Sequence, residues 1–578
     1  MQSTLHRSLK YTRQSTVASQ GVSSNKPLSD SVEVRGDQMF EWAIVERHMS
    51  KRMDESVLLQ RLERALLERD IRTGFSLLDK TLALTGRLDL KKPDAISLFL
   101  CMAQWIDLGY RDISFLDGLV DNTGNLDRAR LPLLDFLKLR MAEAFRALAA
   151  EHPEESIAAL DLVLRAGENL LSEYHVFLAN FWKGRAHRKR GDYEHAILHI
   201  AAARAAAERI GAPRLAAVTK IHESWLAFQK GERQSAFRLL DEAEEELRPT
   251  GHALSLGNIE SARGRFVRRS GEYRRALGHF EAAIAIYTKS CPNHPNLARA
   301  LVNAAYVKRL IALDLQPRRS NGHAVGATHA RYLQISKEAL ELLQKAGEIY
   351  ALHHHQGGTG SVLVNTSHLH LESGDIDRAA TEAQRAFILG EKNRDQILMA
   401  RARVAQSSVQ LAQSDEQLGD PQDVSHHANL ACQYADEAIE LALHTQNKRL
   451  LAETYIARGA AAADDHFQDW EVAKEFAAKG AALLGRDDRD HLYKELGDLK
   501  TKILGSTGID QTLRLWSAGQ LGNKTFQQIQ EEFAELVIPK VWHNVGRNVS
   551  LVSQKLSISP KKVRRILRNA NRLTGSQE

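Results

Sequence analysis

The chain has 578 residues, of which 43% are hydrophobic and 26% charged. These proportions are ordinary for a globular protein, and the length predicts about three to five domains or one long repeat array. Cys101, Cys291 and Cys432 are too widely spaced for a disulfide framework or a zinc knuckle, and no apolar run approaches the ~18 residues of a membrane span. We therefore expect a cytoplasmic protein with no membrane segment.

Residues 1–40 open the chain with a polar stretch rich in Ser, Thr and Gln, and we expect a disordered tail there. An organelle transit peptide has a similar composition and remains an alternative. Residues 41–130 contain helical stretches such as "ESVLLQRLERALLERD" and "AISLFLCMAQWIDLGY". They are either divergent copies of the repeat that follows or an N-terminal helical cap.

The middle of the chain repeats with a period of 40 residues. Gly191, Gly231 and Gly271 occur in "RGDYEHAILHIAAARAA", "KGERQSAFRLLDEAEEE" and "SGEYRRALGHFEAAIAI". Glycine permits the left-handed conformation that ends a helix, and the Asp or Glu after it suits the start of a second helix. Each copy is therefore a predicted helical hairpin. Further copies are indicated at Ser156, at Gly374 after an insertion around 316–328, and in degenerate form at 431–442 and 469–484.

One face of each second helix carries a small, a larger apolar and another small residue. In the first complete copy these are Ala196, Ile200 and Ala203, and the two following copies repeat the pattern. Small residues let neighbouring helices approach closely, and one hairpin cannot bury that face alone. Consecutive hairpins are therefore expected to stack into a superhelix. The equivalent residues are Ala236, Leu240 and Ala243, then Ala276, Phe280 and Ala283.

This pattern resembles the tetratricopeptide repeat. Gly184 stands at that family's small position in the first helix, Tyr193 follows the turn, and Ser224 and Gly264 match Gly184. The period of 40 exceeds the family's usual length of about 34, and the family's Trp and Pro positions are mostly not kept. The resemblance implies an all-α solenoid over residues 131–505, but no particular ligand.

Tetratricopeptide arrays bind ligands on a concave face lined by the first helix of each pair. The register of the resemblance therefore implies a basic groove with one aromatic patch, suited to an acidic protein or peptide ligand or a C-terminal carboxylate. The alternative is that these cations lie at helix C-termini, where they favour the helix dipole, and face water. The implied groove residues are Arg185, Arg188, Lys189, Trp225, Phe228, Gln229, Arg265, Arg268, Arg269, Lys308 and Arg309.

The positive charge of the chain is concentrated at its C-terminus. Of 78 basic and 72 acidic residues, residues 536–578 hold nine and one, so they carry +8 while the remainder carries −2. Asn548 is expected to cap a short helix, and Ser559 with Pro560 to begin a second one. This pattern predicts a compact helix-turn-helix whose second helix presents cations to a DNA groove. The predicted core residues are Leu551, Val552, Leu556, Ile558, Val563, Ile566 and Leu567.

The C-terminal segment, assigned to residues 506–578, resembles the Fis-type DNA-binding domain. That family has Gly-Asn, two small residues four and five positions later, and Gly-Ile nine and ten positions later. Arg547 is an insertion, Val552 replaces a smaller residue, and Ser557 replaces the turn glycine. The resemblance implies double-stranded DNA as a partner. The corresponding positions are Gly546, Asn548, Val552, Ser553, Ser557 and Ile558. The implied DNA-binding residues are Arg547, Ser559, Lys561, Lys562, Arg564, Arg565, Arg568, Asn569 and Arg572.

Fis-type domains dimerise through a preceding helix, and "KTFQQIQEEFAELVIP" supplies one with an apolar stripe. A homodimer is therefore expected. The stripe comprises Phe526, Ile529, Phe533, Leu536 and Val537.

No segment carries a convincing catalytic, metal or cofactor motif. "AGQLGNKT" lacks the glycines of a phosphate-binding loop at Ala518 and Asn523, and adjacent histidines such as His353 to His355 point in different directions on a helix. We expect neither an enzyme nor a bound cofactor. The sequence predicts a DNA-binding transcriptional regulator with a sensor array. The alternatives are a scaffold whose basic tail binds nucleic acid nonspecifically or an acidic partner, and a merely solvated basic cap on the array.

Overall fold

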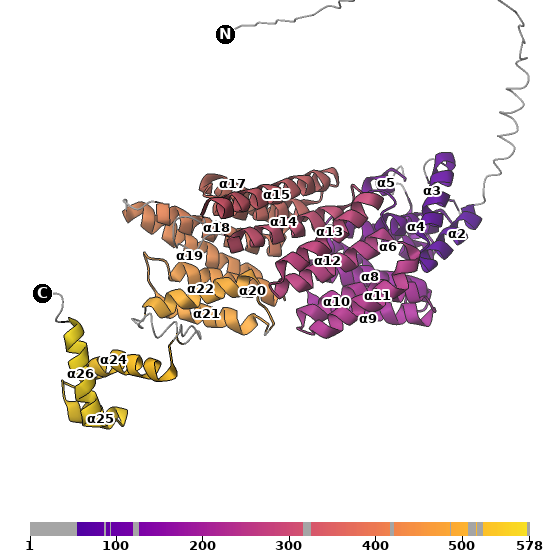
Figure 1. Ribbon diagram of the computed structural model, residues 1–578. Coiled ribbons are helices and arrows are strands. Elements are labelled where there is room, and N and C mark those ends of the chain that lie inside the picture. Colours follow the sequence, from indigo (N-terminus) through magenta and orange to yellow (C-terminus); the bar gives the residue numbers. More distant parts are fainter. Residues whose placement is uncertain are drawn as a thin grey trace, which may run out of the picture. The chain divides into compact units, whose positions relative to one another are not determined.

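The computed structural model describes residues 55–85, 88–92, 94–119, 126–315, 325–416, 421–485, 487–506, 516 and 524–574. The described secondary structure is entirely helical, which confirms the predicted all-α class (Figure 1). The proposed N-terminal tail lies outside the described residues. None of the described helices is long and apolar enough to cross a membrane.

From α6 onward the helices pair as hairpins of the tetratricopeptide-like solenoid. The N-terminal helices are α2 (Glu55–Glu68), α3 (Ile71–Thr85), α4 (Ala95–Asp107) and α5 (Ile113–Gly118). The hairpins are α6 (Leu133–Ala149) with α7 (Pro153–Ala166), α8 (Glu173–Arg190) with α9 (Tyr193–Arg209), α10 (Pro213–Gln229) with α11 (Arg233–Leu247), α12 (Ala253–Arg269) with α13 (Tyr273–Ser290), α14 (Pro295–Leu315) with α15 (Val325–Leu352), α16 (Gln356–Glu372) with α17 (Ile376–Asn393), α18 (Gln396–Glu416) with α19 (Pro421–Leu443), and α20 (Lys448–Ala462) with α21 (Trp470–Leu483), followed by α22 (His491–Ser506).

The turn glycines end the first helices as predicted. Gly191 follows α8 with φ 86°, and Gly231 and Gly271 follow α10 and α12 with φ 88° and 78°. These left-handed values strain any residue with a Cβ. Asp192 then caps α9, because its carboxylate accepts the backbone N–H of His195 at 3.3 Å.

The two helices of a hairpin approach so closely that the small residue of the first lies directly under the large residue of the second. A Cβ at Gly184 would come within 2.8 Å of the Ile200 side chain, and one at Gly264 within 2.9 Å of the Phe280 ring. Real Cβ atoms do not approach side chains this closely. Ser224, the equivalent residue of α10, is fully buried. The predicted small-residue positions are confirmed.

The hydrophobic core continues from one hairpin to the next. One cluster joins Val267 of α12, Phe280 of α13, and Val307 and Leu310 of α14. Each hairpin thus completes its core with the first helix of its successor, which is why the array is a solenoid.

The N-terminal helices extend this core at its first end. α4 is buried along nearly its whole length and packs against α6. Asp107 at its end accepts hydrogen bonds from Trp182 Nε1 at 3.0 Å and from Arg185 at 2.5 Å, both on α8. These contacts tie α4 to the second hairpin.

Turns that are far apart in the sequence touch along the array. Gln446 donates its backbone N–H to the carbonyl of Gly191 at 3.1 Å, and its side-chain oxygen accepts the N–H of Glu194 at 2.9 Å. Glu151 accepts the N–H of Gly357 at 2.6 Å, and Arg489 donates its N–H to the carbonyl of Arg269 at 2.9 Å. We call these the closing contacts, because they join successive turns of the superhelix.

The C-terminal helices have a core of their own. They are α24 (Phe526–Asn544), α25 (Val549–Leu556) and α26 (Pro560–Thr574). Ile538, Val552, Val563 and Ile566 are buried together. The prediction that Leu551 belongs to this core is wrong. Leu551 is 47% exposed, because it lies one position before Val552 and faces away from the core.

The close hairpin packing predicts a stability difference between two glycine substitutions. Gly264→Ala should lower the free energy of unfolding by about 1–3 kcal/mol, because the new methyl collides with Phe280. Gly278 lies exposed on α13 with nothing within 4 Å of its Cβ position. Gly278→Ala should therefore raise stability by about 0.5–1 kcal/mol through helix propensity. Urea denaturation of both variants measures this, and equal effects would contradict the packing described.

Candidate ligand-binding cavity and nucleic-acid surface

The first helices of the hairpins enclose a cavity of about 1020 Å³. Side chains of α8, α10, α12 and α14 line one part of it, and side chains of α16, α18, α20 and α22 line the rest. The closing contacts of Glu151 and Gln446 join these two sets of hairpins. The solenoid thus curves around the cavity, which stays partly open to solvent.

Most of the groove residues implied by the sequence line this cavity. They are Lys189, Trp225, Phe228, Gln229, Arg265, Arg268, Arg269 and Arg309.

Three of the implied groove residues are differently placed. Lys308 pairs with Glu338 of α15 at 2.6 Å and lines a smaller cavity of about 450 Å³ beside α13, so the prediction for Lys308 is wrong. It lies next to Arg309 on α14, and neighbouring helical positions point in different directions. Arg185 is held by Asp107. Arg188 lies beside the lining residues, with its guanidinium 5.6 Å from the ring centre of Trp225.

Four cations form what we call the arginine cluster: Arg188, Arg265, Arg268 and Arg299. Among the described residues, their hydrogen bonds go to neutral oxygens: Arg265 donates to the Ser261 carbonyl at 3.4 Å, and Arg299 to Asn258 at 3.3 Å. Among the residues that the structure describes, no carboxylate forms an ion pair with any of the four.

Burial and mutual repulsion lower the pKa values of this cluster. Burial, together with the positive charges of Arg299 and Arg185, lowers the pKa of Arg188 to about 9. The pKa of Arg265 falls to about 9 for the same reasons, with Arg299 and Arg188 as its nearest cations. The arginine cluster therefore concentrates positive charge at one part of the cavity without an ion-paired carboxylate, which is electrostatically costly.

Aromatic rings support the guanidinium groups. Arg268 lies 4.6 Å from the centre of the Tyr306 ring and Arg269 lies 4.7 Å from that of Phe228. Phe228 in turn stacks on Phe266 at 4.1 Å. A ring fixes the plane of a guanidinium and leaves its N–H edge free for a bidentate acceptor. Arg268 and Arg269 pack on these rings and do not only face water, so the alternative considered from the sequence does not apply to them.

The other wall of the cavity carries carboxylates, two of which, Glu372 and Glu495, form ion pairs. Glu372 binds Arg309 at 2.5 Å, and Glu495 binds His491 at 3.1 Å. Burial raises the pKa of Glu453 on α20. Sequence reasoning missed this wall, because its helices belong to copies whose repeat pattern is degenerate. Arg299 was missed because it lies nine residues before Lys308, the first groove position that the resemblance implied on α14.

The turn between α25 and α26 has the predicted chemistry. Asn548 Oδ1 accepts the backbone N–H groups of Ser550 at 2.9 Å and Leu551 at 3.2 Å. Ser557 adopts φ 51°, the conformation that the glycine of the Fis-type pattern would take without strain. Ser559 Oγ accepts the N–H of Lys562 at 3.2 Å. The two helices are therefore separate and joined by a tight turn.

The exposed face of α26 is basic. Arg565 also pairs with Glu531 of α24 at 2.6 Å, and Arg547 lies 5.7 Å from the Trp542 ring centre with φ 62°. The side chains of Asn569 and Arg572 lie outside the described residues. The exposed cations of α26 are Lys561, Lys562, Arg564, Arg565 and Arg568.

The stripe proposed for dimerisation is only partly covered within one chain. Phe526 and Phe533 are 74% and 49% exposed. Ile529, Leu536 and Val537 are half-buried. Large exposed aromatic side chains on one helix are typical of an association surface.

The comparisons with known proteins show a similarity of fold only. No known protein family and no curated protein matches the sequence. The chain is similar to a Rap protein solved with Competence and Sporulation Factor (14% identity, TM-score 0.45, 78% of this chain and 99% of that one). It is also similar to the apo quorum sensor NprR from B. thuringiensis (12%, 0.44, 66% and 98%). A third is a signal-transduction ATPase with a tetratricopeptide repeat sensor from Pyrococcus horikoshii (12%, 0.39, 82% and 68%).

Proposed function

We propose that the solenoid binds an acidic peptide or an acidic segment of a protein in its cavity. The observation that carries this proposal is the arginine cluster, whose charges lack carboxylate partners among the described residues. A ligand carboxylate would relieve the repulsion between Arg188, Arg265 and Arg299. The aromatic supports of Arg268 and Arg269 favour planar, bidentate acceptors, and a carboxylate is one.

We further propose that the protein is a DNA-binding regulator and that the cavity is its sensor. The support for this is the exposed basic face of α26 behind a capped turn. The last solenoid helix, α22, lines the cavity through His491 and Glu495 and leads in sequence to the C-terminal helices. A ligand that contacts α22 can therefore alter the segment that carries α24 to α26. The competing proposal is a scaffold with a basic tail, which would bind DNA without site preference.

The cavity proposal predicts a charge-selective peptide interaction. A fluorescently labelled decapeptide of alternating Glu and Gly should bind, whereas the same peptide with Lys in place of Glu should not. Arg188→Gln with Arg265→Gln should weaken binding by about tenfold or more, because each lost charged hydrogen bond costs about 1.5–3 kcal/mol. Fluorescence anisotropy measures the affinity. Arg274→Gln, on the exposed side of α13, is the matched control and should change nothing. Equal binding of both peptides would contradict the proposal.

The DNA proposal predicts a salt-dependent loss in a double variant. Lys562→Ala with Arg565→Ala should reduce duplex affinity and lower the slope of log affinity against log salt by about 1.8, since two phosphate contacts are lost. Electrophoretic mobility shifts at several salt concentrations measure both quantities. Arg378→Ala with Lys479→Ala, on exposed positions of α17 and α21, is the control. Selection of genomic fragments separates the regulator from the scaffold, because a scaffold would retain all sequences alike. An unchanged slope would show that α26 does not contact the duplex.

A further inference from the structure

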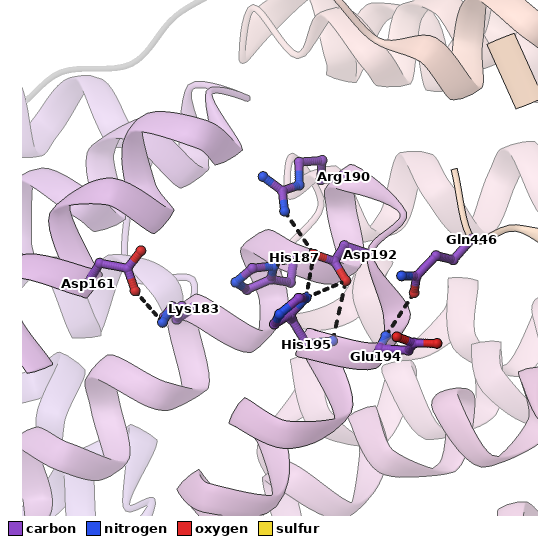
Figure 2. A network of polar contacts seen from close by, with 8 residues as sticks. All are labelled: Asp161, Lys183, His187, Arg190, Asp192, Glu194, His195 and Gln446. Atoms are coloured by element: carbon purple, nitrogen blue, oxygen red, sulfur yellow. Dashed lines mark hydrogen bonds and ion pairs between the residues drawn. The ribbon is translucent and has the colours of Figure 1, made fainter. Parts of the chain in front are cut away.

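The turn between α8 and α9 gathers two histidines and an aspartate (Figure 2). His187 comes from the end of α8, Asp192 from the turn, and His195 from the first turn of α9. Nδ1 of His187 lies 3.0 Å from Asp192 Oδ2, and Nδ1 of His195 lies 2.9 Å from the same oxygen. All three ligand atoms lie within 4.8 Å of one another. We propose that His187, Asp192 and His195 form a binding site for a divalent transition metal ion, with Zn²⁺ as the best fit.

The spacing of the three atoms fits tetrahedral coordination. At metal–ligand distances of about 2.0–2.1 Å, two ligands of a tetrahedral ion lie about 3.3 Å apart. The two histidine nitrogens lie 3.0 and 2.9 Å from Asp192 Oδ2, within a few tenths of an ångström of this value, and within 4.8 Å of each other. A small side-chain shift therefore opens the space that the ion needs. Two imidazoles and one carboxylate leave the fourth position of a tetrahedral ion for water.

The donor atoms can be reached from solvent. His187 is 6% exposed and His195 is 57% exposed, so an ion can enter past His195. Arg190 Nη2 lies 2.8 Å from Asp192 Oδ2, but the Arg190 side chain is 41% exposed and can turn outward into solvent when the ion arrives.

The donor set selects the kind of ion. Imidazole nitrogen favours Zn²⁺, Cu²⁺, Ni²⁺ and Co²⁺, whereas Mg²⁺ and Ca²⁺ favour sites made of oxygen alone. The mixed set of two nitrogens and one oxygen is therefore a transition-metal site. It lies beside a closing contact, because Gly191 and Glu194 of the same turn bind Gln446. An ion that links α8 to α9 would hold this turn in the conformation that meets Gln446.

Metal titration of the full chain, prepared without a histidine tag, tests this assignment. Zn²⁺ should compete with a chromogenic indicator at one tight site per chain, and Co²⁺ should give the visible absorption of a four-coordinate ion. Zn²⁺ should also slow hydrogen exchange at the backbone N–H groups of Glu194 and Gln446. Mg²⁺ should neither compete with the indicator nor slow this hydrogen exchange.

Three variants make the result specific to these residues. His195→Ala removes a largely exposed ligand and should weaken Zn²⁺ binding roughly 10- to 100-fold, at least the loss seen for outer-shell partners. Asp192→Asn keeps the cap on α9, because Asn is an equally good cap, but removes the charged ligand and should also weaken binding. His426→Ala with His427→Ala, a histidine pair on α19, is the control and should bind as the unaltered chain does. The assignment is overturned if the Zn²⁺ affinity and the cobalt spectrum of His195→Ala and Asp192→Asn equal those of the control.

Discussion

The close approach of the two helices in each hairpin is the constraint on which the remaining structure depends. Gly184 beneath Ile200 and Gly264 beneath Phe280 leave no room for a side chain at the crossing. This spacing lets each hairpin share its core with the next, as the cluster of Val267, Phe280 and Val307 shows. The resulting superhelix winds tightly enough that residues 252 positions apart form hydrogen bonds, as Glu194 and Gln446 do. The cavity exists because of this closure.

The curvature of the solenoid around the cavity also determines how the charges that line the cavity are arranged. The first helices turn their polar faces inward, so their cations are brought close together instead of being dispersed in water. Cations with a carboxylate in reach, such as Arg309 beside Glu372, are neutralised within the fold. The arginine cluster has no such partner among the described residues, and its rings hold the guanidinium groups in fixed planes. Unneutralised charge on a rigid, partly enclosed surface does not stabilise the fold. It is typical of a binding site.

Local features of the sequence predicted local structure well. The turn glycines, the cap at Asn548 and the small residues at Gly184 and Gly264 each follow from backbone or steric rules that act within a few residues, and all are confirmed. The sequence did not predict the contacts between residues that are far apart along the chain. The closing contact of Gln446 and the acidic wall around Glu453 depend on superhelical pitch, which no repeat position encodes by itself.

Particular residues show why the site was harder to predict than the fold. Lys308 and Arg309 are adjacent, yet Arg309 lines the large cavity and Lys308 lines the smaller cavity beside α13. The sequence analysis predicted no metal site, because His187, Asp192 and His195 match no spacing motif. Only the sharp turn at Gly191 brings their ligand atoms together. Leu551 was assigned to the core on apolar character alone, although the helix points it outward.

The central claim, that the solenoid closes around the cavity, is tested most directly by a disulfide across a closing contact. A Cβ at Gly191 would lie 3.3 Å from Thr445 Cβ, close to the roughly 3.5–4.5 Å that a disulfide requires. Gly191→Cys with Thr445→Cys, in a chain with Cys291 and Cys432 replaced by Ser, should therefore form an intramolecular disulfide under mild oxidation. Gly374→Cys with Thr445→Cys carries the same left-handed backbone strain at a turn with no neighbour within 4 Å. Rapid cross-linking is expected of the first pair alone, and equal cross-linking of the two pairs would show that the turns of Gly191 and Thr445 do not meet.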